Sequence, residues 1–219
     1  MEDVASVGSA VTGSDDPPAP ETGGHATRQR PGSRVDPAAE KAALAAIQRD
    51  QRDEALKILM TAYGAAITAF ALRVVRDPEA AKDIHQQVFL EVFQGIGKFE
   101  GRSSLWGWLC GIAYHRCLDE LRRGRRAGIA DDIDVWDMLA APSDSMVDAD
   151  RVAKRRALED CLGKLPVALR TQLLMRYFFG LSHSEIGQMV RENHSTVQVR
   201  ISRILPILRN CLRGKGVLR

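Results

Sequence analysis

Apolar residues recur at helical spacing through most of the chain, and this pattern limits the possible folds more than any other feature of the sequence. Between residues 56 and 74 they fall three or four positions apart, which predicts an amphipathic helix of several turns. No segment alternates apolar and polar residues with the period of two that a half-buried strand needs. The sequence therefore predicts an all-α protein.

Local composition divides the 219 residues into four parts. Residues 1–38 are rich in Gly, Pro, Ser, Ala and Asp and show no period, so we expect a disordered N-terminal extension. Helical patterns occupy residues 39–127 and 151–219, and an acidic stretch at 128–150 separates them. We expect two small helical domains joined by an acidic linker.

The charge of the chain is distributed unevenly. Residues 151–219 carry fourteen Lys and Arg against four Asp and Glu, a net charge of +10. The stretch at 128–150 carries seven acids and no base, a net charge of −7. A small domain with such a positive excess is typical of a nucleic-acid binder.

The segment SHSEIGQMVRENHSTVQVRISRILP, residues 182–206, predicts two helices joined by a tight corner. Ser182 and Glu185 have the spacing of a capping box, and Asn193 is a good cap for the second helix. The outward face of that helix is expected to present His194, Ser195, Gln198, Arg200 and Arg203, with Thr196 near its start. Such side chains suit the major groove of DNA, whereas the alternative is a helical hairpin with a solvated basic face. The net charge of this part favours a DNA-binding helix-turn-helix.

Pro206 interrupts the second helix of this pair. Proline removes a backbone hydrogen bond and its ring clashes with the carbonyl four residues earlier, here that of Ser202. The sequence predicts that the helix kinks or ends near Leu205, and that residues 207–212 turn back onto the domain.

The N-terminus carries acids where a signal peptide carries bases, and no apolar run approaches the ~20 residues of a membrane span. We therefore expect a cytoplasmic protein without membrane insertion, whose cysteines are buried thiols and not disulfides. Cys110 and Cys117 lie seven residues apart on one predicted helix, too far for a bridge. A metal site of these two with His115 has no second cluster of ligands, so helix packing is the better interpretation and no cofactor is expected.

Both helical parts resemble the extracytoplasmic-function (ECF) group of bacterial RNA polymerase sigma factors. The first resemblance lies in AAKDIHQQVFLEVF followed by FEGRSSLWGWLCGIAYHRCLDELRR, and the second in LGKLPVALRTQLLMRYFFGLSHSEIGQMVRENHSTVQVRISRI. Together they cover roughly residues 50–127 and 151–213. The resemblance implies that the first domain binds core RNA polymerase and the −10 promoter element, and that the second binds the −35 element.

The resemblance also implies roles for single residues. Asp83, Gln86 and Gln87 are expected to contact core polymerase. The −10 contacts implied are Arg102, Trp106, His115, Arg122, Arg123, Arg125 and Arg126. The −35 contacts implied are Arg170, Arg176, Ser195, Thr196, Gln198, Arg200 and Arg203. Core packing is the expected role of Trp108, and for Trp106 core packing and DNA contact both stay open.

Three positions depart from the family pattern. Lys82 stands where the family usually has Glu, and His115 where it usually has Asn. At the corner, Arg191-Glu192-Asn193 replaces the usual Gly-apolar-Ser. Because a left-handed residue other than glycine is disfavoured, this predicts a corner that is looser or set at a different angle. The family also implies an anti-sigma partner and promoter DNA. The sequence shows no nucleophile elbow, P-loop, paired-carboxylate pocket or metal cluster, so we expect no enzymatic activity. The alternative is a helix-turn-helix regulator that binds DNA without joining the polymerase, but the first domain lacks the mixed α/β pattern of its usual sensing domains.

Overall fold

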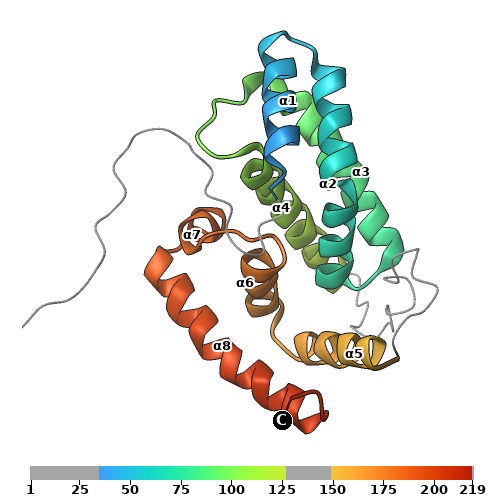
Figure 1. Ribbon diagram of the computed structural model, residues 1–219, viewed down its shortest axis with the longest axis vertical. Coiled ribbons are helices and arrows are strands. Elements are labelled where there is room, and N and C mark those ends of the chain that lie inside the picture. Colours follow the sequence, from blue (N-terminus) through green and yellow to red (C-terminus); the bar gives the residue numbers. More distant parts are fainter. Residues whose placement is uncertain (1–34, 127–148, 219) are drawn as a thin grey trace, which may run out of the picture.

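The computed structural model describes residues 35–126 and 149–218, all of whose regular elements are helices (Figure 1). The first group comprises α1 (Pro37–Gln48), α2 (Arg52–Val75), α3 (Pro78–Gly95), the short 3-10 helix η1 (Ile96–Lys98) and α4 (Leu105–Arg126). The second comprises α5 (Ala149–Gly163), α6 (Val167–Tyr177), α7 (His183–Val190) and α8 (His194–Gly214). The all-α prediction is confirmed. Most of the predicted extension and of the acidic linker lies outside the described residues.

The first four α-helices form a bundle around α2 (Figure 1). Side chains such as Leu59, Ile67 and Phe70 are fully buried along α2, against α1, α3 and α4. By length and composition alone α2 meets the criteria for a membrane span, contrary to the expectation that no segment approaches them. Half of its apolar window is buried inside the bundle, which is how the core helix of a folded domain looks.

Local signals set the ends of these helices. Asp77 accepts hydrogen bonds from the backbone N–H groups of Glu79 and Ala80, and Pro78 occupies the first turn of α3. At the start of α4 the hydroxyl of Ser104 accepts from the N–H of Gly107 at 3.0 Å.

Helices α5 to α8 build the second group, and its predicted caps are confirmed. Ser182 and Glu185 form a reciprocal capping box at α7, and the side chain of Asn193 accepts from the N–H of Ser195 at 3.1 Å. Gly180 takes a φ of +76°, which lets the chain leave α6 sharply. The helix-turn-helix of α7 and α8 is therefore fixed by local sequence.

The corner between α7 and α8 is more firmly held than predicted. Arg191 itself adopts the left-handed conformation, with φ 58° and ψ 45°, and donates its N–H to the carbonyl of Gly187. A Cβ atom at Gly187 would lie 2.6 Å from the carbonyl oxygen of Glu192, so the helix accepts the crossing backbone only because this residue is glycine. The Glu192 carboxylate makes a two-pronged ion pair with Arg200, at 2.6 and 3.0 Å. The corner thus keeps a left-handed residue although Arg191 is not glycine, and the ion pair and the close approach at Gly187 hold it.

The prediction for Pro206 is also wrong. Helix α8 continues through Pro206 to Gly214 as one element (Figure 1). Pro206 and Ser202 are both exposed, and on the exposed side of a helix water can satisfy a carbonyl that loses its N–H partner. Beyond the proline, Leu208 packs on the core and Cys211 is covalently fixed, so the second half of the helix stays in line.

A disulfide joins Cys161 of α5 to Cys211 of α8, with 5.9 Å between their Cα atoms. The expectation of free thiols is therefore wrong for this pair and confirmed for Cys110 and Cys117, which are buried and unbridged. Burial raises the pKa of both free thiols, so they stay protonated near neutral pH. The bridge spans 50 residues of sequence, a proximity that only the packing of α5 on α8 creates.

Candidate nucleic-acid and protein interfaces

The outer face of α3 presents the residues expected to contact polymerase. Asp83 and Gln86 are exposed and Gln87 is half-buried, whereas Ile84 and Val88 point into the bundle with no exposed surface. Lys82 pairs with Glu79 at 2.6 Å, and this hydrogen bond raises the pKa of the lysine. The charge that departs from the family pattern is thus balanced within the same helix.

Two apolar side chains of α3 extend this face, and the sequence analysis missed them. Leu90 is 58% exposed and Phe93 is 37% exposed, about two and about three turns after Asp83. Large apolar residues left uncovered beside polar ones are typical of protein interfaces. Their position in the sequence, outside the buried stripe of Ile84, Val88 and Val92, could have identified them as exposed.

Basic and polar residues expected at the −10 element lie along the η1–α4 loop and the outer side of α4. Arg102 and His115 are exposed, and Arg102 pairs with Glu100 at 3.0 Å. Near the end of α4, exposed Arg122 and Arg123 pair with acids one turn earlier, Asp119 and Glu120. Arg125 and Arg126 belong to the last turn of α4, and their side chains lie outside the described part.

Trp106 and Trp108, two residues apart in α4, have separate environments. Trp108 packs on Phe99 with 5.4 Å between ring centroids, which agrees with its expected packing role. Trp106 is 1% exposed, and its indole N–H donates to the backbone carbonyl of Phe179 at 3.0 Å. Its ring also contacts Tyr63 at 4.7 Å and Phe179 at 4.8 Å. Trp106 is thus a core residue, and its assignment to DNA is corrected: the apolar ring is covered and its polar atom is satisfied.

This tryptophan is part of a contact between the two helical groups, which we call the interdomain contact. It consists of Phe70, Arg73 and Trp106 on one side and Glu159, Arg170 and Phe179 on the other. Phe70 and Phe179 stack with centroids 4.3 Å apart. The result is one continuous core that runs from α2 and α4 into α6.

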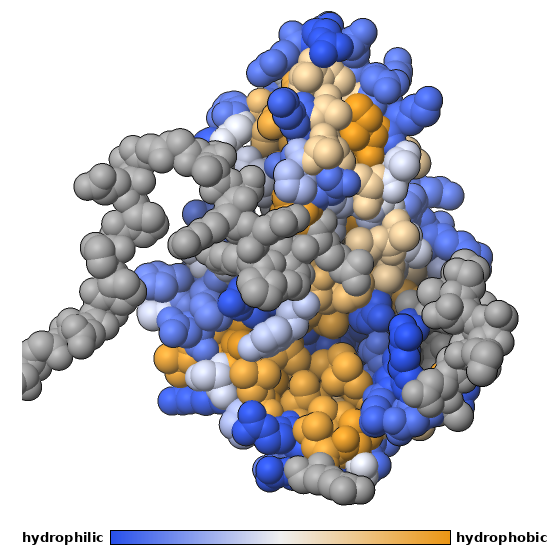
Figure 2. Space-filling view, in the orientation of Figure 1, coloured by the Kyte–Doolittle hydropathy of each residue, from blue (hydrophilic) through white to orange (hydrophobic). Residues whose placement is uncertain are grey.

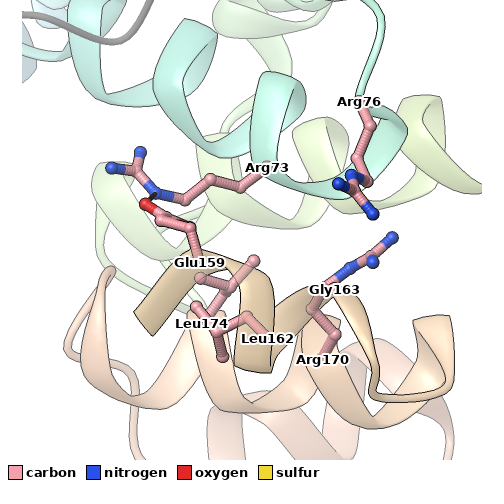
Figure 3. Close-up of a pocket in the computed structure, with 7 residues that line it drawn as sticks. All are labelled: Arg73, Arg76, Glu159, Leu162, Gly163, Arg170 and Leu174. Carbon is pink, nitrogen blue, oxygen red and sulfur yellow. Dashed lines mark hydrogen bonds and ion pairs between the residues drawn. The ribbon is translucent and has the colours of Figure 1, made fainter. Parts of the chain in front are cut away.

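Charged groups close the side of the interdomain contact (Figure 3). Arg73 donates to the Glu159 carboxylate at 3.0 Å, and both side chains are nearly buried, with 13% and 5% of their surface exposed. Arg170 donates to the carbonyl of Val74, near the C-terminal end of α2, at 2.9 Å. Figure 3 shows Arg76 and Arg170 pointing toward each other from the two sides.

These contacts correct a second expected DNA residue. Arg170 is 4% exposed and its guanidinium serves the interdomain contact, so it is not on a DNA-facing surface. Arg176 is half-buried and donates to the carbonyl of Leu181 at 2.9 Å, where it holds the turn that leads into α7. A long arginine predicted on a basic face can instead reach a buried carbonyl, and sequence spacing does not distinguish the two outcomes.

The outward face of α8, which we call the reading face, carries most of the residues expected to contact the −35 element. Ser195, Thr196, Gln198 and Arg203 are exposed, while Val197, Ile201 and Ile204 are buried beneath them. Arg200 is half-buried, because its guanidinium is held by Glu192. The hydroxyl of Ser195 accompanies its N–H at the Asn193 cap, with 3.2 Å between the two oxygens.

Apolar surface adjoins this reading face. A groove of about 520 Å³ beside α8 is lined by Thr196 and Arg203 together with the apolar Leu169, Val199 and Ile207. Figure 2 shows hydrophobic residues gathered over the C-terminal helices. In contrast to these surfaces, the described residues hold no group of three or more His, Cys, Asp or Glu side chains arranged to bind a metal.

Two segments of the chain match known families. Residues 59–127 match Sigma-70 region 2, and residues 155–205 match Sigma-70, region 4. The chain is 30% identical to the RNA polymerase sigma-H factor of Pseudomonas aeruginosa over 168 residues, which cover 72% of this chain and 86% of that protein. It is 28% identical to the ECF RNA polymerase sigma factor SigK of Mycobacterium tuberculosis over 149 residues, 67% of this chain and 79% of that one.

The fold has solved counterparts. The sigma factor RpoE of Bartonella quintana, in complex with the anti-sigma factor NepR, matches 72% of this chain and 96% of its own with a TM-score of 0.60 at 20% identity. CnrH, in complex with the cytosolic domain of CnrY, matches 81% of this chain and 98% of its own with a TM-score of 0.56 at 21% identity.

Fold and matches together define a transcription initiation factor. The chain belongs to the sigma-70 family of RNA polymerase sigma factors, in its ECF group. Sigma factors bind core RNA polymerase and direct it to specific promoters, and in general they are not catalytic. The match to region 2 does not favour the alternative of a helix-turn-helix regulator that acts apart from the polymerase.

Proposed function

We propose that residues 39–127 bind core polymerase and the −10 element, and that residues 151–219 bind the −35 element. The observation that carries this division is the separation of two exposed surfaces: the polar face of α3 and the basic face of α8. On α3, Asp83, Gln86 and Gln87 contact the polymerase, joined by the exposed Leu90 and Phe93.

The −10 surface that we propose excludes Trp106. It comprises Arg102, His115, Arg122, Arg123, Arg125 and Arg126. Their charge is suited to the phosphates beside an unstacked base, where binding must offset an unstacking cost of a few kcal/mol. On the −35 side Ser195, Thr196, Gln198 and Arg203 face the major groove, and Arg200 fixes the corner through Glu192.

The described arrangement is closed, and promoter binding requires it to open. The two elements lie roughly 25 base pairs apart by their names, which is roughly 85 Å of B-DNA at 3.4 Å per base pair. In the closed arrangement α7 instead packs on α4, and a Cβ atom on Gly107 would lie 3.7 Å from the Glu185 carboxylate. We propose that binding to polymerase and DNA breaks the interdomain contact and separates the two domains.

Two further properties follow from the family. One solved counterpart holds the anti-sigma factor NepR and another holds the cytosolic domain of CnrY, and we propose an anti-sigma partner for this chain. We also propose that the protein acts in the cytoplasm, where its polymerase is, and that it has no enzymatic activity of its own.

Transcription with purified core polymerase tests the proposal. We expect the chain to co-elute with the core enzyme in gel filtration and to support promoter-specific run-off transcripts from a library of genomic fragments. Asp83→Ala with Gln86→Ala should weaken the polymerase complex while leaving the helical circular dichroism unchanged. Lys57→Ala, an exposed change on α2, is the matched control and should not weaken it. Absence of both a complex and a specific transcript would show that the chain acts in another way.

A further inference from the structure

The outward centre of α8 is occupied by an apolar residue that the polar reading face left out. At about 100° per residue, Val199 lies directly opposite the buried stripe of Val197, Ile201 and Ile204. Val199 is 47% exposed. Ser195 stands one turn before it on the same face, and Arg203 stands one turn after it.

Several neighbours of Val199 already have hydrogen-bond partners within the domain. Arg200 is bound by Glu192 at 2.6 and 3.0 Å, and the hydroxyl of Ser202 donates to the carbonyl of Val199 at 2.8 Å. The hydroxyl of Ser195 is engaged at the helix cap. Val199 is the apolar residue at the middle of this face, and it reaches outward beside the exposed Gln198 and Arg203 without a hydrogen bond to give up.

We propose that Val199 reads a thymine of the −35 element through the thymine C5-methyl group. In the major groove thymine is the base that presents a methyl group, and aliphatic side chains recognise it by apolar contact. A valine at the centre of the docking helix contacts the floor of the groove. Against a polar base edge it would displace water without offering a hydrogen bond, whereas against a methyl group it makes an apolar contact. The inference rests on the proposed −35 role of α8, and it assigns a specificity-determining residue within that surface.

The test removes the C5-methyl group from the base and the two γ-methyl groups from the side chain. Promoter sequences are first selected with holoenzyme formed from the full chain and core polymerase, and each thymidine of the −35 element is then replaced singly by deoxyuridine. For the wild-type protein we expect one replacement to lower affinity about fourfold, the effect of losing one buried methyl contact. Val199→Ala should lower affinity for the natural promoter similarly, and it should make the same deoxyuridine replacement silent.

Controls separate this contact from general effects. Leu158→Ala removes an exposed aliphatic side chain from α5, and it should leave the sensitivity to deoxyuridine intact. Val199→Thr keeps one methyl group and should retain part of the sensitivity. The proposal is overturned if no single replacement weakens wild-type binding, or if the sensitivity persists in Val199→Ala.

A second arm distinguishes failure of this inference from failure of the proposed function. The full chain without polymerase is used to select from a pool of randomised duplexes, and the same deoxyuridine replacements are made in the selected sequence. If holoenzyme gives no specific transcript, the sigma role fails, yet loss of sensitivity in Val199→Ala would still support the methyl contact. If the chain also selects no duplex sequence, the contact is refuted together with the reading role of α8.

Discussion

The N-terminal domain and the C-terminal domain are each stabilised in a different way. The N-terminal bundle surrounds α2 on three sides and buries several of its aromatic and aliphatic side chains, among them Tyr63, Ile67 and Phe70. The C-terminal helices have a smaller interior that continues into the N-terminal bundle at Phe179, and a disulfide fastens α5 to α8. In the separation that we propose, detachment exposes part of this smaller core, and the cross-link then helps to keep α5 on α8.

The largest effect is expected where one side chain serves both domains. Trp106→Ala should lower the free energy of unfolding by about 4 kcal/mol, since it removes a buried ring and leaves a cavity between Tyr63 and Phe179. Trp108→Ala is the matched control, and its loss should be clearly smaller because Trp108 is only half-buried. Urea unfolding followed by circular dichroism measures both. Equal losses would mean that the interdomain contact adds no stability.

The next effect concerns the buried ion pair of the interdomain contact. Glu159→Ala strands the Arg73 guanidinium without its carboxylate, which should cost about 3 kcal/mol and open the molecule. Small-angle scattering should then show a larger radius of gyration. Glu79→Ala breaks an exposed pair with Lys82 and should leave the radius unchanged. A compact Glu159→Ala protein would contradict the role of this pair in closure.

Loss of the disulfide should destabilise one domain only. Reduction, or Cys161→Ser with Cys211→Ser, should lower the stability of the C-terminal helices by about 2 kcal/mol. Hydrogen exchange should accelerate in α5 and α8 and remain slow in α2. Reductant should not change the stability of the double variant, because the remaining Cys110 and Cys117 form no bridge. Equal acceleration in α2 would show that the domains unfold as one unit.

The smallest effect is a pH dependence at the start of α4. Glu40 of α1 accepts the N–H of Trp106 at 2.7 Å, and burial raises the pKa of this carboxyl although the hydrogen bonds from Trp106 and Leu105 lower it. The folded state therefore holds the proton more tightly than the unfolded chain does. Its contribution is present below the unfolded pKa and is lost as pH rises through the folded pKa. Glu40→Gln should flatten the stability profile in that acidic window, and an unchanged slope would contradict the shift.

Local sequence was enough for the features that depend on neighbouring residues. Helix starts at Asp77, Ser182 and Asn193 follow from side chains that satisfy the first free N–H groups of each helix. Apolar spacing determined which face of α8 is buried and which is exposed, and so most of the reading surface. These interactions span one or two turns, so they are already written in the order of the residues.

Contacts between distant segments were decided by tertiary structure alone. The burial of Trp106, the inward turn of Arg170 and the Cys161–Cys211 bridge each need a partner 50 or more residues away. The continuation of α8 through Pro206 likewise depends on what holds its far end, since Cys211 is fixed to α5. A local pattern indicates which side chains can be buried. The free energy gained depends on how much of their surface another segment covers, and that is determined by the tertiary structure.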